Sequence, residues 1–288
     1  MKRLIFRRTI PMNFTVLMCV YAGDALSAFS QALSSCTTGQ KLKPKEVIIL
    51  RNGPVSVELE KFLCSVENNS IRVIRLEENL GLARALNIGL AKVSTPWIAR
   101  MDADDISLPY RFEKQIAYLT NHPHVHVLGT ALQEFKQSSS DNFIWGTPRI
   151  LPTEHNDLNR FARLQSPIHH PTVMIRTSTL KSIGGYPENS GRFEDYVLWE
   201  RLLLKGYIFA NLPDILLGYR VDSGSYTRRG GLIMFKDELH LQSAFLKDGF
   251  ITPLQYVRNL IIRGFYRLIP TSVKKPLYRL RSAITNKA

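Results

Sequence analysis

Short apolar runs alternate with helix-like segments along the first hundred residues of the chain. Runs typical of buried strands lie at residues 14–20, 47–50, 71–76 and 97–101. Segments with apolar residues three or four positions apart separate them, at residues 25–35, 55–66 and 82–93. Strands that alternate with helices are typical of βαβ units, so this half predicts a mostly parallel sheet with flanking helices. The strand-to-helix loops of such a sheet meet at its carboxyl edge, where ligands bind.

The pattern becomes irregular after a helix predicted at residues 110–119. Further strands are expected at residues 125–135, 172–175, 208–210 and 215–221, and further helices at 157–164 and 194–204. Every apolar run is shorter than the ~18 residues that a membrane-spanning helix needs. The sequence therefore predicts one α/β domain without a transmembrane helix.

Composition places this domain between two basic ends. The 288 residues are 44% hydrophobic and 22% charged, which excludes a disordered or low-complexity chain. Of the net charge of +14, residues 1–10 contribute four basic side chains and residues 249–288 contribute eight, with no acidic residue in either segment. The nearly neutral remainder argues against a nucleic-acid-binding domain. We therefore expect a basic N-terminal appendage at 1–11, a domain at 12–248 and a basic helical tail at 249–288.

The tail has the pattern of an amphipathic helix. Its two faces are formed by Val257, Leu260, Ile261, Phe265 and Leu268 on one side and by Arg263 and Arg267 on the other. This pattern favours a helix that lies on an anionic membrane surface with its cations among the head groups, although a helix packed on the domain with a solvated basic face is the alternative. Three cysteines cannot form a disulfide framework, so we expect a cytoplasmic protein held peripherally at the inner face of the plasma membrane.

The sharpest chemical signal is a run of carboxylates, Asp102-Ala103-Asp104-Asp105, directly after a buried strand. Acidic side chains that repel one another and lose hydration there are stabilised most readily by a cation. Mg²⁺ or Mn²⁺ beside a diphosphate is commonly held by one or two carboxylates, with water and phosphate as the other ligands. The alternative is an acidic N-terminus for the helix that follows Pro109.

Two more segments carry candidate binding or catalytic groups. The run from Asn79-Leu80-Gly81 to Gly89 opens a helix whose first backbone N–H groups and Arg84 suit a phosphate or a base carbonyl, or else form an ordinary amphipathic helix. Glu194 and Asp195 begin a later helix, where a carboxylate suits either general-base work or simple charge matching to the helix.

Histidine and arginine residues of the second half are weaker candidates. His170, in His169-His170-Pro171, has no partners at metal-ligand spacing, so a packed or acceptor-facing histidine is expected. Arg220, Arg228 and Arg229 flank Ser223-Gly224-Ser225 and suit either closure over a diphosphate or a solvated loop.

Taken in order, these segments resemble the inverting family 2 glycosyltransferases of bacterial polysaccharide and O-antigen biosynthesis, which have the GT-A fold. The resemblance covers about residues 13–225. It rests on the opening strand Val16-Leu17-Met18-Cys19-Val20-Tyr21, the run Asn79-Leu80-Gly81 with Arg84 and Asn87-Ile88-Gly89, the strand and acidic loop from Trp97 to Asp105 with Pro109-Tyr110-Arg111, and Gly184-Gly185-Tyr186 followed by Glu194-Asp195 and Trp199.

The resemblance implies transfer of a sugar from a nucleotide donor, expected to be a UDP-sugar, to a glycan or polyprenyl-linked glycan with inversion. It assigns Asp104 and Asp102 to a Mg²⁺ or Mn²⁺ ion and Asp195, beside Glu194, to deprotonation of the acceptor. The implied donor-binding residues are Tyr21, Asn52, Arg84, Asp102, Ala103 and Asp104. The implied residues for acceptor contact or loop closure are His170, Trp199 and Arg220.

One position departs from the family pattern. Asn52 stands after the second strand, where the family usually has an aspartate that recognises the base. Because an amide oxygen accepts a hydrogen bond less strongly than a carboxylate, uridine is less firmly expected. Two other functions remain open: a phosphotransferase of the haloacid dehalogenase type, which also uses Asp-x-Asp, and a non-catalytic protein that binds nucleotide sugars.

Overall fold

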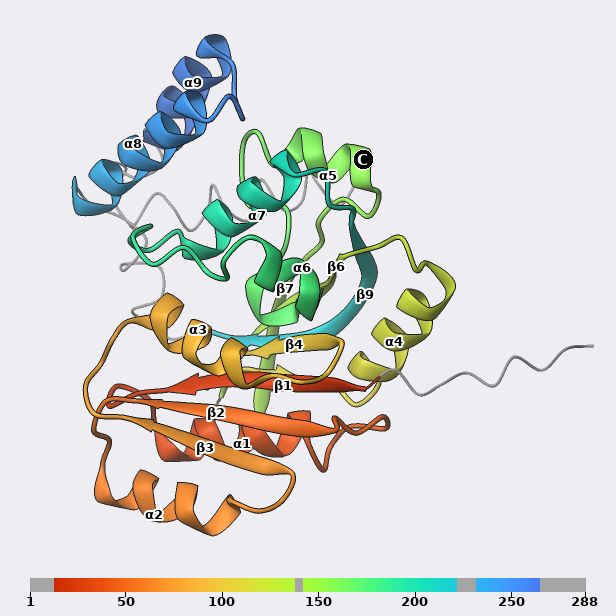
Figure 1. Ribbon diagram of the computed structural model, residues 1–288, viewed down its shortest axis with the longest axis vertical. Coiled ribbons are helices and arrows are strands. Elements are labelled where there is room, and N and C mark those ends of the chain that lie inside the picture. Colours follow the sequence, from red (N-terminus) through yellow and green to blue (C-terminus); the bar gives the residue numbers. More distant parts are fainter. Residues whose placement is uncertain (1–12, 138–141, 222–231, 265–288) are drawn as a thin grey trace, which may run out of the picture.

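A computed structural model describes residues 13–137, 142–221 and 232–264 of the chain. Four of its strands, β1 (Phe14–Val20), β2 (Glu46–Asn52), β3 (Ile71–Leu76) and β4 (Trp97–Met101), pair in parallel in the order β3-β2-β1-β4. This confirms the predicted βαβ half, in which β1, β3 and β4 have the bounds expected from their apolar runs. All four strands end at one edge of the sheet (Figure 1), so their following loops meet there.

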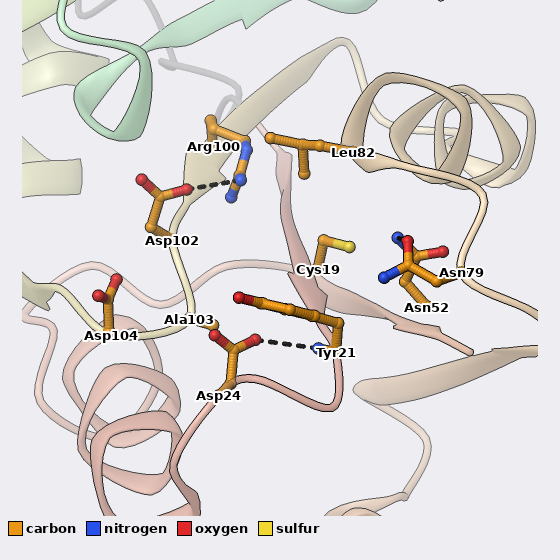
Figure 2. Close-up of a pocket in the computed structure, with 10 residues that line it drawn as sticks. All are labelled: Cys19, Tyr21, Asp24, Asn52, Asn79, Leu82, Arg100, Asp102, Ala103 and Asp104. Atoms are coloured by element: carbon orange, nitrogen blue, oxygen red, sulfur yellow. Dashed lines mark hydrogen bonds and ion pairs between the residues drawn. The ribbon is translucent and has the colours of Figure 1, made fainter. Parts of the chain in front are cut away.

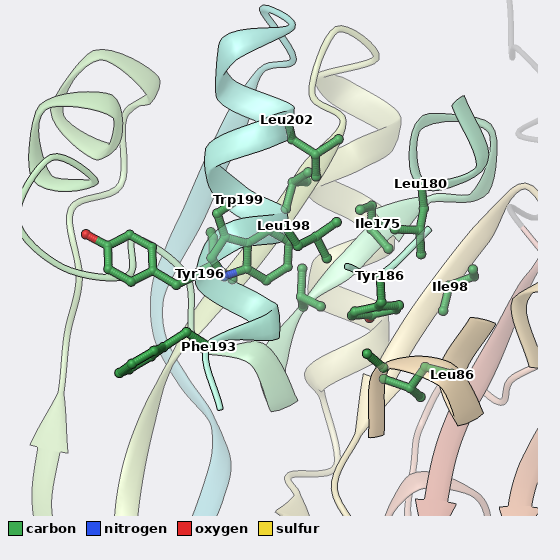
Figure 3. Close-up of a cluster of buried hydrophobic side chains, with 14 of the residues drawn as sticks. Leu86, Ile98, Ile175, Leu180, Tyr186, Phe193, Tyr196, Leu198, Trp199 and Leu202 are labelled. Atoms are coloured by element: carbon green, nitrogen blue, oxygen red, sulfur yellow. The ribbon is translucent and has the colours of Figure 1, made fainter. Parts of the chain in front are cut away.

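Two hydrophobic cores cover the two faces of these parallel strands. Because side chains of a strand alternate between faces, Val16 and Met18 pack with α1 (Leu26–Cys36), α2 (Val57–Val66) and α4 (Arg111–Asn121). Leu17 and Cys19 point the other way, into the core that contains α3 (Leu82–Lys92), α6 (Thr177–Ser182) and α7 (Glu194–Leu204). Figure 3 shows α7 side chains converging on this second core.

The second half extends the sheet with mixed pairing. Its strands are β5 (Ile106–Ser107), β6 (Val127–Gln137), β7 (Phe143–Arg149), β8 (Met174–Arg176) and β9 (Phe209–Arg220). They continue the order as β4-β8-β6-β9-β5, with β7 on β6. The two strands expected at 208–210 and 215–221 are one strand, β9, whose register against β6 shifts near Pro213. Proline has no N–H for the ladder, which explains why the apolar pattern is interrupted there.

Further helices complete the domain on the α7 side of the sheet. They are α5 (His155–Phe161), a 3₁₀ turn at His170–Thr172, and a C-terminal series formed by α8 (Leu232–Lys247), α9 (Pro253–Asn259) and a π-helical turn at Leu260–Gly264. Figure 1 shows α8 and α9 side by side beyond α7. Phe250 and Ile251 between them are buried in the core, so the boundary expected at residue 248 falls within a packed unit.

The polarity of this last segment is the reverse of a packed amphipathic helix. Asn259 is fully buried and Arg263 packs inward, whereas Leu254 and Ile261 are 80% and 65% exposed. The prediction that Arg263 lies on an outer polar face, among membrane head groups or in solvent, is therefore wrong, because Glu238 and the Leu164 carbonyl hold its guanidinium inside the protein. Residues 1–11 and 265–288, with Phe265, Arg267 and Leu268, lie outside the described residues. No helix within the described ranges has the length and apolar content needed to cross a membrane.

Candidate active site

A cavity of about 310 Å³ opens at the carboxyl edge of β1, β2 and β4. Figure 2 shows the side chains that surround it, which come from the ends of these strands, from the loops that follow β1, β3 and β4, and from the start of α3. Its lining residues are Cys19, Tyr21, Asp24, Asn52, Asn79, Leu82, Arg100, Asp102, Ala103 and Asp104. The structure therefore brings together five of the six predicted donor-binding residues. The exception is Arg84, which is exposed on α3 and is not among the lining residues.

Two carboxylates of the acidic loop face this cavity, and the third lies behind it. Asp102 and Asp104 line the pocket, whereas Asp105 is fully buried and accepts a hydrogen bond from the backbone N–H of Arg220 at 2.9 Å. Burial, followed by the charge of Asp102, raises the pKa of Asp104 to about 6. A bound cation would relieve both effects. The pair of hard oxygen donors fits Mg²⁺ or Mn²⁺, provided that phosphate and water complete the coordination.

Arg100 fixes the orientation of Asp102 from the strand below. Its guanidinium is buried and donates to Asp102 Oδ1 at 2.6 Å, and a second nitrogen donates to the Met101 carbonyl. One oxygen of Asp102 is thus held by the protein and the other remains available. The sequence reasoning missed Arg100, although a charged residue in the middle of a buried strand beside an acidic loop is a usable signal.

Asp24 is a third carboxylate of the pocket that the sequence reasoning missed. Its Oδ2 accepts the backbone N–H of Tyr21 at 2.9 Å, which closes the turn after β1. Burial raises its pKa to about 6, and the charges of Asp104 and Asp102 contribute. Within the described part of the chain, no three His, Cys, Asp or Glu side chains are arranged as a ready-made metal site. The one sequence signal that could have identified Asp24 is its position in the turn that follows a strand of the predicted parallel sheet.

Asn52 supports the loop that leads into α3. Its amide donates to Asn79 Oδ1 at 3.0 Å, and its oxygen accepts the Leu80 N–H at 2.9 Å. Gly53 allows this approach, because its φ is +82° and a Cβ there would lie 2.7 Å from the Asn79 nitrogen. Asn52 therefore lines the pocket and also joins the end of β2 to the loop after β3. An ionised aspartate could accept the Leu80 N–H but could not donate to Asn79.

The carboxylates that begin α7 are electrostatically coupled to the acidic loop. Burial and the neighbouring Glu194 raise the pKa of Asp195 to about 7, and the charge of Asp102 adds to the shift. Burial also raises the pKa of Glu194. A carboxylate with a pKa near neutrality suits a general base, although neither Asp195 nor Glu194 is among the residues that line the cavity.

His170 and Trp199 lie behind this region. His170 is buried, its Nε2 lies 3.1 Å from the Tyr186 hydroxyl, and burial holds its pKa well below the usual range. Trp199 is completely buried and packs edge-on against Phe209. The expected contact of Trp199 with an acceptor is therefore corrected: its ring belongs to the core and does not face the pocket.

Arg220 holds the acidic loop from the outside. Its Nε donates to the Asp104 carbonyl at 2.7 Å, and its other two nitrogens donate to Gln137 and Gln31. The structure thus shows Arg220 as a support for the loop. Arg228 and Arg229, for which both closure over a diphosphate and a solvated loop were open, lie outside the described residues.

Comparison with known proteins assigns the chain to a family. A sequence model described as glycosyl transferase family 2 matches residues 15–182, which include α3, the whole acidic loop and all of β1 except Phe14. The chain belongs to glycosyltransferase family 2. The enzyme is therefore a glycosyltransferase, and neither the phosphotransferase nor the non-catalytic reading is favoured.

Full-length relatives agree with this assignment. The amylovoran biosynthesis glycosyltransferase AmsE of Erwinia amylovora is 36% identical over 92% of this chain and 97% of its own. An Escherichia coli enzyme named UDP-Gal:alpha-D-GlcNAc-diphosphoundecaprenol beta-1,3-galactosyltransferase is 33% identical over 93% of this chain and 95% of its own. A further relative, named O-antigen biosynthesis glycosyltransferase WbnJ of Escherichia coli, is 32% identical over 72% of this chain and 80% of its own.

Solved structures confirm the GT-A fold. Residues 1–349 of TarS from S. aureus, in complex with UDP-GlcNAc, give a TM-score of 0.62 at 19% identity, over 82% of this glycosyltransferase and 67% of that chain. The mannosyltransferase PcManGT from Pyrobaculum calidifontis, in complex with GDP-Man and Mn²⁺, gives 0.60 at 16% identity over 97% and 76%.

Proposed function

We propose that this glycosyltransferase moves a sugar from a UDP-sugar to a hydroxyl of a lipid-linked glycan, with inversion at the anomeric carbon. The observation that carries the proposal is the electrostatic coupling of Asp195 to Asp102. Asp195 is not among the residues that line the cavity, but the charge of Asp102 contributes to its raised pKa, which supports a general base near the loop suited to a diphosphate. The galactosyltransferase relative, whose name states a UDP-sugar donor and a diphospholipid-linked acceptor, supports both substrate classes.

On the donor side, the pocket residues bind the nucleotide diphosphate together with a divalent cation. Asp104 and the free oxygen of Asp102 hold Mg²⁺ or Mn²⁺, and the ion supplies charge neutralisation for the leaving diphosphate. Arg100 keeps Asp102 in place through the hydrogen bond at 2.6 Å. Tyr21 and Asn52 line the part of the cavity nearest β1 and β2, where the nucleoside binds.

On the acceptor side, Asp195 takes the proton of the acceptor hydroxyl. The oxygen of that hydroxyl forms the new bond to the anomeric carbon while the bond to the diphosphate breaks. Because attack comes from the face opposite the leaving group, the configuration inverts. Glu194 raises the pKa of Asp195 through its negative charge and so makes Asp195 a stronger base.

The C-terminal segment places the enzyme on an anionic membrane surface, where a lipid-linked acceptor is found. Leu254, Val257, Ile261 and Ile262 expose an apolar strip on the outside of α9 and the π-helical turn. Residues 265–288 follow it with six basic side chains and no acidic one. An apolar strip followed by unopposed cations suits insertion into the acyl boundary of an anionic bilayer.

Release of nucleoside diphosphate from single UDP-sugars tests the reaction. With a diphospholipid-linked sugar as acceptor, we expect release that depends on Mg²⁺ or Mn²⁺ and stops with a chelator. Asp104→Ala should abolish it, and Asp195→Asn should slow it by about 10²–10⁴-fold while nucleotide binding persists. Near-normal transfer by Asp195→Asn would remove this residue from the role of base. Transfer that is indifferent to chelation would contradict the metal assignment.

A further inference from the structure

The C-terminal turn reaches back to the helix that carries Asp195. The Arg263 guanidinium forms a two-pronged ion pair with Glu238 of α8, with Nε–Oε1 at 2.5 Å and Nη2–Oε2 at 2.9 Å. Its remaining nitrogen donates to the Leu164 carbonyl at 2.8 Å. Glu238 is 0% exposed. All three guanidinium nitrogens are therefore committed inside the protein, which fixes the plane and position of the group.

This guanidinium lies against the first turn of α7. Its centre is 5.6 Å from the centroid of the Tyr196 ring, and the Tyr196 hydroxyl donates to the Ala162 carbonyl at 2.7 Å. Phe245 of α8 packs edge-on against the same ring at 4.9 Å. The Tyr196 backbone N–H in turn donates to Asp195 Oδ1 at 2.7 Å. An unbroken series of contacts thus runs from Glu238 through Arg263 and Tyr196 to the carboxylate of Asp195.

A buried ion pair of this kind specifies position more than it stabilises the fold. Removing two charges from water offsets most of their mutual attraction, so well-packed apolar residues of similar volume are often equally stable. Such residues have no directional contacts with the Leu164 carbonyl or the Tyr196 ring. The pair is thus well suited to hold the first turn of α7 in one position, and a misplacement of about 1 Å is enough to impair positioned catalysis.

We propose that Arg263, held by Glu238, is a positioning residue that sets the carboxylate of Asp195 through Tyr196. This inference rests on the proposed role of Asp195 as general base. It assigns a catalytic purpose to a segment outside the residues that match the family model, because Arg263 lies well beyond residue 182. The segment formed by α9 and the π-helical turn thus exposes its apolar strip on the outside, and its inner side supports Asp195.

The experiment compares Arg263→Met, Arg263→Lys and the double variant Arg263→Met/Glu238→Leu in the full chain. The double variant leaves no unpaired buried charge, so its thermal midpoint should stay near that of the unaltered enzyme. We expect Arg263→Met and the double variant to lower kcat by about 10–100-fold, with donor KM and nucleotide affinity within about twofold. Arg263→Lys should recover part of kcat. Lys236→Met, an exposed cation two residues before Glu238 on α8, is the matched control and should change nothing.

A double-mutant cycle separates this inference from the base assignment. In the Asp195→Asn background, Arg263→Met should have almost no further effect on the residual rate, because the group it positions is gone. Additive losses, or a double variant with an unaltered kcat, would overturn the positioning role while leaving Asp195 as base. If Asp195→Asn alone transfers at a near-normal rate, the base assignment fails and the inference fails with it.

Discussion

The side-chain amide of Asn87 pairs with both backbone groups of Tyr186, 99 residues further along the chain. Its nitrogen donates to the Tyr186 carbonyl at 2.9 Å, and its oxygen accepts the Tyr186 N–H at 2.7 Å. Gly185 makes this possible, because its φ is +85° and a Cβ there would lie 2.3 Å from the Asn87 oxygen. Two motifs recognised separately in the sequence thus form one clamp between α3 and the loop that leads to α7.

Removing this clamp should impair the acceptor side of the site more than the donor side. We expect Asn87→Ala to lower the free energy of unfolding by about 1–3 kcal/mol, because it leaves backbone groups of Tyr186 unpaired. Transfer should fall while nucleotide affinity stays nearly constant. Denaturant titration, initial rates and nucleotide binding measure the three effects. Lys92→Ala, an exposed position of the same helix, is the control, and an equal loss there would contradict the clamp.

The fold was predictable where apolar pattern and topology agree. The runs that became β1 and β4 are buried along their whole length, which favours a mostly apolar sequence, whereas the edge strand β3 is only partly buried and alternates apolar residues with Arg72 and Arg75. The strand β7 was missed because Phe143–Arg149 contains Gly146 and Pro148 and is largely exposed. The long strand β9 was expected as two because Pro213 interrupts its pattern.

The site was predictable only to the level of motifs. Asp102, Asp104 and Asp195 stand out in the sequence because acidic groups follow or begin regular elements. Their supports stand out less: Arg100 and Asp24 make local contacts with Asp102 and Tyr21, and only the pairing of β1 with β4 brings them to one pocket. Helical periodicity predicted Arg263 on a polar outer face, because it could not show that the buried carboxylate of Glu238 would pair with Arg263 in the folded chain.

Activity should depend on the ionisation of Asp195. A base must be deprotonated to act, so kcat should rise as the pH passes upward through about 7, the value to which burial and Glu194 raise its pKa. Glu194→Gln removes a like charge and should move the midpoint of the acid limb to lower pH. A pH–rate profile of both proteins measures the shift. A midpoint that moves upward would show that Glu194 does not act on Asp195 in this way.

Arg100 should control the affinity for the divalent cation. It orients Asp102 from behind, and loss of such a partner usually costs about 10–100-fold in metal affinity or activity. We therefore expect Arg100→Gln to raise the half-saturating Mn²⁺ concentration by about that factor. Arg72→Gln, an exposed residue paired with Glu46, serves as control and should leave it unchanged. If Arg100→Gln requires the same Mn²⁺ concentration as the unaltered enzyme, Arg100 does not influence the metal site.

Glu200 should destabilise the enzyme at alkaline pH. It is 1% exposed, and neither carboxylate oxygen has a hydrogen-bond partner among the described residues. Burial, followed by Asp248, raises its pKa to about 7. Because the folded value lies above the unfolded one, ionisation as the pH rises from about 4 to 7 lowers stability.

Substitution of Glu200 should therefore increase stability in a pH-dependent way. At pH 8 we expect Glu200→Gln to raise the free energy of unfolding by about 1–3 kcal/mol, because the amide removes the cost of ionising a buried carboxyl, which is about 1.4 kcal/mol per pKa unit. At pH 5, where the native residue is protonated, the gain should almost vanish. Urea titrations at the two pH values measure it. An equal gain at both would assign the effect to packing and not to charge.

Membrane binding should depend on the outward face of α9 and on the cations beyond it. Val257→Ser/Ile261→Ser removes apolar surface without touching the inward contacts of Asn259 and Arg263. Sedimentation with anionic vesicles should show weaker binding by this variant. A chain that ends at residue 264 lacks six cations, so its vesicle binding should no longer depend on salt. Ile144→Ser, an equally exposed isoleucine on β7, is the control. If the double variant binds as tightly as the unaltered chain, or if anionic and neutral vesicles bind equally, the strip contacts something other than an anionic bilayer.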